Sequence, residues 1–321
     1  MSIDTDSKTI LVGISACLMG HNVRFNGGHS QSRLCRNQLS ECFSFKPFCP
    51  EVIAGFSIPR PTMRLIGDPD NPTLTYTKDT TADLTCQLIT AFQPMLEKCA
   101  ELDGFILKKD SPSCGMERVK IYQESGHPHS QRGAGLFASA LMQSFPELPV
   151  EEEGRLNDPQ LRENFIMRVF ARHHFRVEVE TEPSFHKLQQ FHSRYKYLLM
   201  AQSQTTYRAL GQLLADRRNK PLDELIPLYL KEFMAAVKKP CSRGANCNVM
   251  QHIMGYLSKS LSRETRDDML QVFEQYRRGD LNLATPMTLL SHYIHQNGSN
   301  YIRAQRYLKP YPSHLGLRNQ L

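Results

Sequence analysis

The first half of the chain alternates short apolar runs with amphipathic stretches and loops. Apolar residues recur at helical spacing over residues 79–101, and residues 134–145 predict a second, shorter helix. Residues 54–67 and 123–135 are rich in loop-forming residues, so neither is expected to form a regular element. Buried strands are predicted for apolar runs at residues 9–15, 43–48 and 104–107 and from residue 148 onward. This alternation predicts an α/β domain with three layers and a mostly parallel sheet.

The second half of the chain changes character and reads as helical throughout. Apolar residues such as Phe185, Leu188 and Phe191 recur at the spacing that places side chains on one face of a helix. The acidic run at residues 151–153 and the Asn-Asp-Pro stretch at residues 157–159 are predicted to form the linker. We therefore predict two domains, an α/β domain at residues 1–153 and an all-α domain at residues 154–321.

Three of the predicted strands are each followed by a cysteine, namely Cys17, Cys49 and Cys114. In an open α/β sheet, ligands bind beyond the carboxyl ends of the strands, so the three thiols are expected to share one site. Three thiolates can hold a metal ion or an iron–sulfur cluster, and on a cluster they leave one iron without a protein ligand. However, the spacings typical of ferredoxins and zinc ribbons do not occur, and a buried cysteine is often only a small apolar residue. The pattern by itself leaves both interpretations open.

The composition is typical of a globular protein without membrane spans. The chain has 321 residues, enough for two domains with full cores, and 40% of them are hydrophobic. No apolar run approaches the ~20 residues of a membrane span, and residues 1–8 are polar with mixed charge, unlike a leader peptide. We therefore expect no membrane association and a cytoplasmic protein with reduced thiols. Nine cysteines, an odd number, then favour metal binding or catalysis over disulfides.

The net charge of +7 is unevenly distributed along the chain. Residues 1–150 carry 14 Lys and Arg against 15 Asp and Glu, whereas residues 151–321 carry 25 against 17. This surplus indicates a polyanionic partner for the second half, although a solvated basic surface would have the same composition. Basic residues that lie among tyrosines could contact phosphates while the rings stack on bases. The candidates for such contacts are Arg194, Lys196, Arg303, Arg306 and Lys309.

The remaining cysteines are predicted to be structural. Two of those in the first domain lie on or near the apolar face of a predicted helix, where burial is the expectation. Cys241 and Cys247, together with His252, form an incomplete ligand set for a metal, so that stretch is predicted to be a loop. Cys35 and Cys42 are predicted to be packing or incidental thiols, and Cys86 and Cys99 are predicted to lie in the core.

Three motifs in the chain resemble those of the thiouracil desulfurase family. They are Ser-Ala-Cys-Leu-Met-Gly at residues 15–20, Cys-Pro-Glu-Val at residues 49–52 and Lys-x-x-Ser-Pro-Ser-Cys-Gly at residues 108–115. The rest of the chain resembles a helical domain that is often fused to this family. The combination is similar to bacterial desulfidases that remove sulfur from 4-thiouridine in tRNA.

The resemblance implies a [4Fe-4S] cluster on the three strand-end cysteines, with one open iron. Glu51, two residues after a cluster ligand, is the candidate general acid or base, with a salt-bridged structural glutamate as the alternative. Ser111 and Ser113 are further catalytic candidates, because they could relay a proton or donate to the substrate ring. Serines beside a proline also make plain turn hydrogen bonds, so both roles stay open.

The function implied by the resemblance is removal of sulfur from 4-thiouridine in tRNA, giving uridine and hydrosulfide without electron transfer. The basic helical domain would then hold the tRNA. A second hypothesis within the enzyme class is desulfuration of free thiouracil or thionucleosides. A third, from another class, is an RNA-binding or regulatory protein whose cluster is a sensor. A glutamate beside three cysteines argues against the sensor, and charge confined to the second half favours a polymeric substrate. The sequence predicts no particular oligomeric state.

Overall fold

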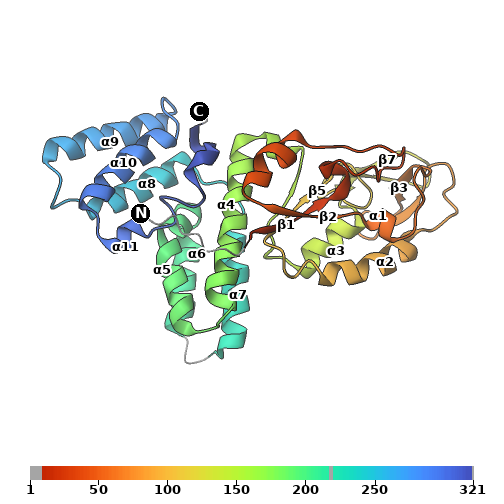
Figure 1. Cartoon of the computed structure of the whole chain (residues 1–321), viewed down its shortest axis with the longest axis horizontal. Helices are drawn as coiled ribbons and strands as arrows, with labels where there is room; N and C mark the ends of the chain where they lie inside the picture. The colour runs from red at the N-terminus through yellow and green to blue at the C-terminus, as the bar shows by residue number, and fades with distance from the viewer. Residues whose placement is uncertain (1–8, 217–219, 320–321) are drawn as a thin grey trace. The chain divides into compact units, whose positions relative to one another are not determined.

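The computed structural model describes residues 9–216 and 220–319, which belong to two compact units (Figure 1). The division lies between Asn157 and Asp158, slightly beyond the boundary predicted at residues 153 and 154. Residues 1–8, on which the expectation of no leader peptide rests, lie outside the described residues. Among the described residues, no helix is long and apolar enough to cross a membrane.

The first unit is built on a parallel sheet with the strand order β2-β1-β5-β8. In the central strand, Ile14 lies opposite Pro47 of one neighbour and Ile106 of the other. Because parallel strands end at the same edge, the loops after β1, β2 and β5 all leave from one side of the sheet. The four strands predicted from apolar runs are therefore present, as β1 (Leu11–Ser15), β2 (Ser44–Phe48), β5 (Gly104–Leu107) and β8 (Val150–Glu152).

One face of this sheet packs against α2 (Thr85–Glu97) and α3 (Leu136–Ser144). The ring of Phe105, fully buried on β5, lies 5.7 Å from the ring of Phe137 on α3. A Cβ atom at Gly13 on β1 would lie 2.4 Å from the Phe105 ring, so only glycine fits there. The opposite face carries the buried side chains of Val12 and Ile14, as the alternation of a strand requires. The predicted α/β class is thus confirmed.

A second, mixed sheet was not predicted from the sequence. Its strand order is β4-β3-β6-β7, with β3 antiparallel to β4, parallel to β6, and β6 antiparallel to β7. The expectation that residues 54–67 and 123–135 lack regular structure is therefore wrong in part. Each segment contains a short strand: β3 pairs with the nearby β4 and the distant β6, and β7 pairs with the nearby β6. Strand formation depends on such pairing, which the composition of a single segment does not show. The strands are β3 (Met63–Ile66), β4 (Thr73–Tyr76), β6 (Val119–Tyr122) and β7 (Pro128–Gly133).

The second unit is all-α among its described residues, which confirms the predicted class. Its core is aromatic: the Phe191 ring stacks on Tyr195 with centroids 4.4 Å apart and meets the Phe233 ring edge-on at 5.2 Å. Side-chain oxygens of serine or aspartate accept the first free N–H groups of several helices, as at Asp158 and Ser184. The helices are α4 (Pro159–Phe175), α5 (Phe185–Gln202), α6 (Gln204–Ala215), α7 (Leu222–Ala236), α8 (Arg243–Gly255), α9 (Arg263–Arg278), α10 (Ala284–Asn297) and α11 (Asn300–Arg303).

The stretch from Cys241 to Cys247, predicted to be a loop, is mostly helical. Helix α8 begins at Arg243, and the Ser242 hydroxyl oxygen accepts the N–H of Ala245 at 3.2 Å. Serine is a preferred residue at this position, so the helix start was readable from the sequence.

Candidate active site

The carboxyl edge of the parallel sheet opens into a pocket of about 300 Å³. The three strand-end cysteines, Cys17, Cys49 and Cys114, all line it. Glu51 and Ser111 line the same pocket, and Ser113 lies directly behind Glu51. The structure therefore brings the predicted cluster ligands and the predicted catalytic residues together, although they come from three segments far apart in the chain.

Local backbone geometry places each cysteine. Cys17 lies in η1 (Ala16–Met19), a short 3₁₀ helix that ends at Gly20 with φ of 96°. This left-handed backbone conformation favours glycine. Cys49 is the residue before α1 (Pro50–Ile53), whose first position holds a proline, as helix starts often do.

Cys114 lies in a tight turn that follows β5. The Gly115 N–H donates to the Ser111 carbonyl at 2.8 Å, and a Cβ atom at Gly115 would lie 2.3 Å from the Val119 side chain. The Ser111 hydroxyl oxygen accepts the N–H groups of Cys114 and Ser113 at 3.1 and 3.2 Å. Of the two roles left open for Ser111, turn formation is therefore the one seen in the structure.

Burial makes the three thiols weak acids. It raises the pKa of Cys17 to about 11, with the neighbouring Cys49 sulfur adding to the effect and Lys108 opposing it. Burial also raises the pKa of Cys49, and it raises that of Cys114 furthest, again with Cys49 as a contributor. The three sulfurs thus act on one another electrostatically, and a positive centre that binds thiolates would relieve the cost of ionising them.

The donor set of the pocket is three thiols on separate loops, a ligand type that iron–sulfur clusters use. Within residues 9–216 and 220–319, no three His, Cys, Asp or Glu side chains are close enough together to hold one metal ion. Three thiols around a pocket of about 300 Å³ instead leave room for a larger inorganic group between them.

Glu51 is held by two partners. One carboxylate oxygen accepts a hydrogen bond from the Ser113 hydroxyl at 2.8 Å, and the other forms an ion pair with Arg60. The Glu51 side chain is 14% exposed and that of Arg60 only 3%. Glu51 is therefore both salt-bridged, as the structural alternative predicted, and at the pocket wall, as the catalytic hypothesis requires. Arg60 was missed as a partner, because nothing in its local sequence points to Glu51.

The acidic run at residues 151–153 is not a linker. Its first two residues belong to β8, and its carboxylates hold both ends of the cysteine turn. The Glu152 carboxylate accepts the Met116 N–H at 2.7 Å, while Glu153 pairs with Lys108 and accepts the Lys109 N–H at 2.8 Å. This run therefore supports the turn that carries Cys114.

The other cysteines lie apart from the pocket. Cys35 and Cys99 are buried, as predicted, and Cys42 is half-buried. The expectation for Cys86 is wrong: its side chain is exposed, because it lies in the first turn of α2 on the side away from Leu88. In the second unit, the Cys241 thiol donates to the Ala201 carbonyl and the Cys247 thiol to the Phe273 carbonyl.

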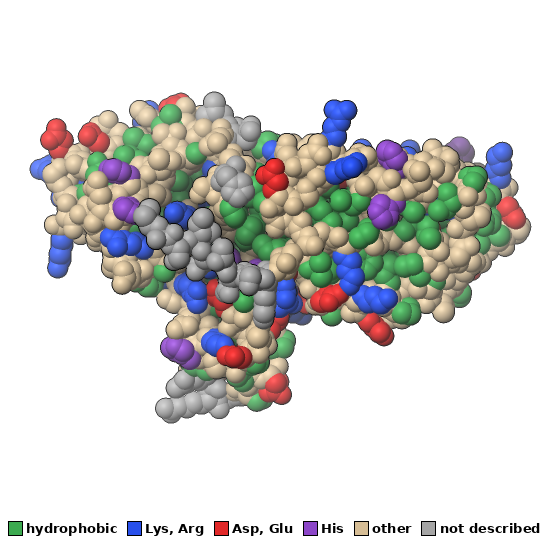
Figure 2. Space-filling model, viewed as in Figure 1, with side chains coloured by type: hydrophobic (Ala, Val, Ile, Leu, Met, Phe, Trp, Pro, Cys, Tyr) green, Lys and Arg blue, Asp and Glu red, His purple; other side chains and the backbone are tan. Residues whose placement is uncertain are grey.

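The five predicted RNA contacts do not form one group of free cations. Arg194 and Arg306 both pair with Glu178, at 3.0 and 3.5 Å. The guanidinium of Arg303 donates to the last carbonyls of α10, at Ile294 and His295. Figure 2 shows Lys and Arg side chains scattered over both units on the visible face, with acidic side chains between them. Of the five, Lys309 is exposed and Lys196 is half-buried, its ammonium 5.2 Å from the Tyr197 ring centroid.

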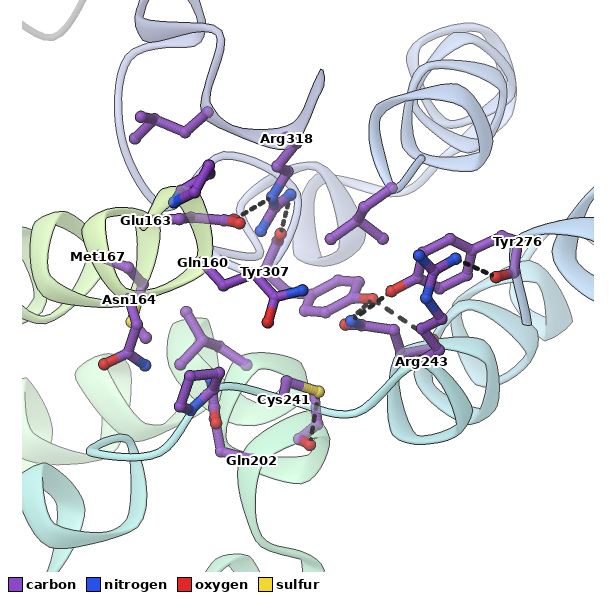
Figure 3. Close-up of a pocket in the computed structure, with 17 residues that line it drawn as sticks. Gln160, Glu163, Asn164, Met167, Gln202, Cys241, Arg243, Tyr276, Tyr307 and Arg318 are labelled. Carbon is purple, nitrogen blue, oxygen red and sulfur yellow. Dashed lines mark hydrogen bonds and ion pairs between the residues drawn. The ribbon is translucent and has the colours of Figure 1, made fainter. Parts of the chain in front are cut away.

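The second unit contains a pocket of its own, of about 140 Å³ (Figure 3). Its polar side chains bond mainly to one another: Glu163 pairs with Arg318 at 2.9 Å, and the Tyr307 hydroxyl donates to the Asn246 side chain at 2.9 Å. The Arg243 guanidinium donates to the Tyr276 carbonyl at 2.9 Å. None of the five predicted RNA contacts is among the residues that line this pocket.

The fold and the pocket define the first unit as an α/β domain with three cysteines at the carboxyl edge of a parallel sheet. Residues 12–153 match the family described as 2-thiouracil desulfurase, and the chain belongs to this family. Residues 196–312 match a family described as a protein of unknown function, DUF1722.

Two relatives bear the name of uncharacterized proteins. YbbK of Bacillus subtilis (strain 168) is 32% identical over 154 residues, which are 46% of this chain and 99% of that protein. YbgA of Escherichia coli (strain K12) is 27% identical over 165 residues, 51% of this chain and 98% of that protein. A solved structure of the [4Fe-4S]-dependent thiouracil desulfidase TudS is 26% identical, with a TM-score of 0.36, over 47% of this chain and 95% of that one.

Proposed function

We propose that the first unit removes sulfur from a thiolated uracil base, and that the substrate is 4-thiouridine in tRNA. The observation that carries this proposal is the convergence of Cys17, Cys49 and Cys114 with Glu51 on one pocket. The match to the 2-thiouracil desulfurase family supports the class of reaction.

In this proposal the three cysteines hold a [4Fe-4S] cluster with one iron free of protein ligands. When bound, the cluster would supply a Lewis-acidic iron with affinity for the thiocarbonyl sulfur. The thiols come from three loops held by the sheet and by the clamped turn at Cys114, so the pocket keeps them in place.

Glu51 is the proposed general base and acid. Its carboxylate lies at the pocket wall, where it can take a proton from the water that adds to the ring carbon. The proton then passes to the leaving sulfur as the C–S bond breaks, so that thiouracil and water give uracil and hydrogen sulfide, released as hydrosulfide. No electron is gained or lost. Arg60 and Ser113 fix the orientation of the carboxylate through the ion pair and the 2.8 Å hydrogen bond.

The helical unit is proposed to bind the tRNA. Its support is the surplus of Lys and Arg over acidic residues in the second half of the chain. Because three of the predicted arginines hold the unit together, Lys196 and Lys309 are the better candidates for phosphate contacts.

The test is a substrate comparison with the full-length protein, reconstituted anaerobically with iron and sulfide. Loss of 4-thiouridine from bulk tRNA supports the proposal. Loss of sulfur from free 4-thiouracil alone would favour the second hypothesis, a desulfurase of small molecules. A protein that holds about four irons per chain but consumes neither substrate would favour the sensor hypothesis. The Glu51 carboxylate, bonded to Ser113 at the pocket, argues against that hypothesis, because a sensor needs no general acid or base.

A further inference from the structure

Two tyrosine rings are exposed beside each other on the helical unit. Tyr256, the residue that ends α8, is 50% exposed, and Tyr301 in α11 is 37% exposed. Their ring centroids lie 6.0 Å apart, with the ring planes inclined by 41°. Among the described residues of this unit, the one other large hydrophobic side chain that is exposed is Leu270. The two adjacent rings thus form an aromatic surface that the core of the unit leaves uncovered.

Neighbouring side chains hold these rings in place. The buried Tyr197 ring meets the Tyr256 ring edge-on at 6.3 Å. Tyr197 comes from α5, which packs against α8 (Figure 1). The Lys196 ammonium lies 5.2 Å from the Tyr197 ring centroid and also acts on Tyr301: burial raises the pKa of Tyr301, and Lys196 opposes this rise. Tyr256, Tyr301 and Lys196 are here called the tyrosine surface.

The charges of the helical unit are segregated along the chain. Residues 158–321 contain 24 Lys and Arg and 14 Asp and Glu. All the acidic residues lie in three segments, at residues 158–182, 216–232 and 264–280. The other three segments contain 13 Lys and Arg and no Asp or Glu, and they are residues 183–215, 233–263 and 281–321. Every residue of the tyrosine surface belongs to these acid-free segments, so the chain that builds this surface favours a polyanionic partner.

The lysines of this region have no carboxylate partner. Lys196 is half-buried, and Lys259, three residues after Tyr256, is exposed. Within residues 9–216 and 220–319, neither lysine forms an ion pair, although Arg194 and Arg306 of the same acid-free segments do. The tyrosine surface therefore combines exposed rings with positive charge that is free to bind an anion.

Unpaired nucleotides fit such a surface. Each nucleotide carries a flat base that stacks on an aromatic ring and a phosphate that a lysine binds. In a duplex the bases stack on one another, so rings on a protein surface do not reach their faces. An acidic protein segment would pair with the lysines but would leave the two rings without a flat partner. The combination therefore favours single-stranded RNA over both.

We propose that Tyr256 and Tyr301 stack on unpaired bases of an RNA while Lys196 and Lys259 contact its phosphates. This inference rests on the proposed tRNA binding by the helical unit and narrows that binding to a loop or a single-stranded end of the tRNA. The tyrosines that adjoin the predicted RNA contacts in the sequence do not offer a ring to a base, because they are buried. They are Tyr195, Tyr197 and Tyr307.

The experiment measures, by fluorescence anisotropy, how the iron-loaded full chain binds a short oligouridylate and a duplex RNA with the same number of phosphates. In the double variant Tyr256→Ala with Tyr301→Ala, the Kd for the oligouridylate should rise about tenfold or more, because stacking is lost at two bases. The Kd for the duplex should change less than about twofold. The salt dependence should stay the same, since no cation is removed. Equal weakening for both RNAs would contradict stacking.

Two control variants separate stacking from other effects. Tyr256→Phe with Tyr301→Phe keeps both rings and should retain the binding of oligouridylate, whereas a loss as large as that of the alanine variant would assign the effect to the hydroxyls. Leu270→Ala removes an exposed side chain of the same unit, on α9, and should bind as the unaltered protein does. Equal weakening by Leu270→Ala would overturn the tyrosine surface.

A competition tests the class of partner. Unlabelled oligouridylate should displace the labelled strand far better than an oligoglutamate of the same charge, because the peptide has no bases to stack. Equal displacement by the two would make an acidic protein segment the partner and would overturn the assignment to RNA.

Sulfide release from tRNA that contains 4-thiouridine, measured with the same proteins, separates the tyrosine surface from the proposed reaction. If no thiolated substrate releases sulfide, the proposed reaction fails, yet a loss of single-strand binding confined to the alanine variant would still support the tyrosine surface. If tRNA loses its sulfur and the alanine variant binds oligouridylate and tRNA normally, the tyrosine surface is wrong and the proposed reaction stands.

Discussion

The two units each contain a pocket lined by arginine, glutamate and cysteine, yet the two pockets differ in where their polar groups point. In the helical unit, Glu163 and Arg318 satisfy each other, and tyrosine hydroxyls close a network with Asn246. In the first unit, three thiols and a glutamate border open space, and the buried Nε of Arg60 has no hydrogen-bond partner. The comparison teaches that a candidate site is recognised where reactive groups, here three thiols, converge on open space instead of on one another.

The same contrast applies to charge. The helical unit has the larger surplus of basic residues, but three of its candidate arginines hold its own carboxylate and carbonyl groups. The first unit is nearly neutral, but it places Arg24 and Lys109 without ion-pair partners, among the described residues, at the pocket margin. Net charge therefore predicts an electrostatic tendency of a domain but not the location of its binding site.

The largest expected effect concerns the thiols. Replacing Cys17, Cys49 or Cys114 by alanine should abolish the four irons per chain expected after anaerobic reconstitution, measured by iron and sulfide analysis. Replacement of Cys99 or Cys241 should leave the iron content unchanged, because neither thiol lines the cysteine pocket of the first unit. If Cys42→Ala lost the iron while Cys49→Ala kept it, the assignment of ligands would be wrong.

The next effect concerns the carboxylate. Glu51→Gln preserves the shape of the side chain and should keep the iron, yet slow turnover by about 10²-fold or more, because an amide cannot take up the proton. The measurement is sulfide release from a thiolated substrate at saturation. Glu101→Gln, on an exposed glutamate of the same unit, is the control. A near-normal rate for Glu51→Gln would leave this residue with a structural role alone.

Replacing a glycine by alanine should change the free energy of unfolding in opposite directions in the two units. Gly13→Ala would force a Cβ atom against the Phe105 ring and should destabilise the first unit by about 1–3 kcal/mol. Gly211→Ala places its Cβ in open space within α6 and should stabilise the helical unit by about 0.5–1 kcal/mol. Urea unfolding of the full chain followed by circular dichroism measures both, and the same sign for both variants would contradict the packing described here.

The helical unit should also lose stability in mild acid through His192. Burial, reinforced by Lys196, lowers the pKa of this histidine to about 4, so it is neutral in the folded state near neutral pH. The unfolded chain takes up the proton first, with a pKa of about 6.5, so stability falls as the pH drops from about 6.5 to 4. The loss attributable to His192 is about 2 kcal/mol, reduced from the full shift because the ring is partly exposed.

His192→Gln should flatten this pH dependence, since glutamine can still bond the Tyr229 hydroxyl but does not titrate. The measurement is the urea midpoint at pH 7 and at pH 4.5. His186→Gln, on an exposed residue of the same helix, serves as the comparison and should retain the acid sensitivity. Equal pH dependence in the parent protein and His192→Gln would remove the histidine from this account.

The smallest effect is expected at the helical surface. Lys196→Gln with Lys309→Gln should weaken tRNA binding by a few-fold and lower the salt dependence, with each lost phosphate contact reducing the log–log slope by about 0.7–0.9. Titrations at two salt concentrations measure this, with iron content as the control for an intact first unit. An unchanged slope would transfer the tRNA contacts to other residues.

The sequence predicts the cysteine site better than it predicts the second sheet and the side chains that support the site. The convergence of Cys17, Cys49 and Cys114 follows from a rule of topology, because parallel strands deliver their loops to one edge. The strands β3 and β7 were missed because their segments are rich in loop-forming residues, and their stability comes from pairing with β4 and β6, which the pattern of a single segment does not show. The pairing of Arg60 with Glu51 was not predicted either, because it depends on the folded path of the chain between these two residues.

The central claim is that the cysteine pocket removes sulfur by hydrolysis and without electron transfer. The most direct test adds the iron-loaded full chain to tRNA that contains 4-thiouridine, with no electron donor present, and measures both the thiouridine lost and the hydrosulfide released. The account predicts one hydrosulfide per thiouridine lost, sustained over many turnovers. A reaction that stops after a single turnover, or that proceeds only when a reductant is added, would contradict it.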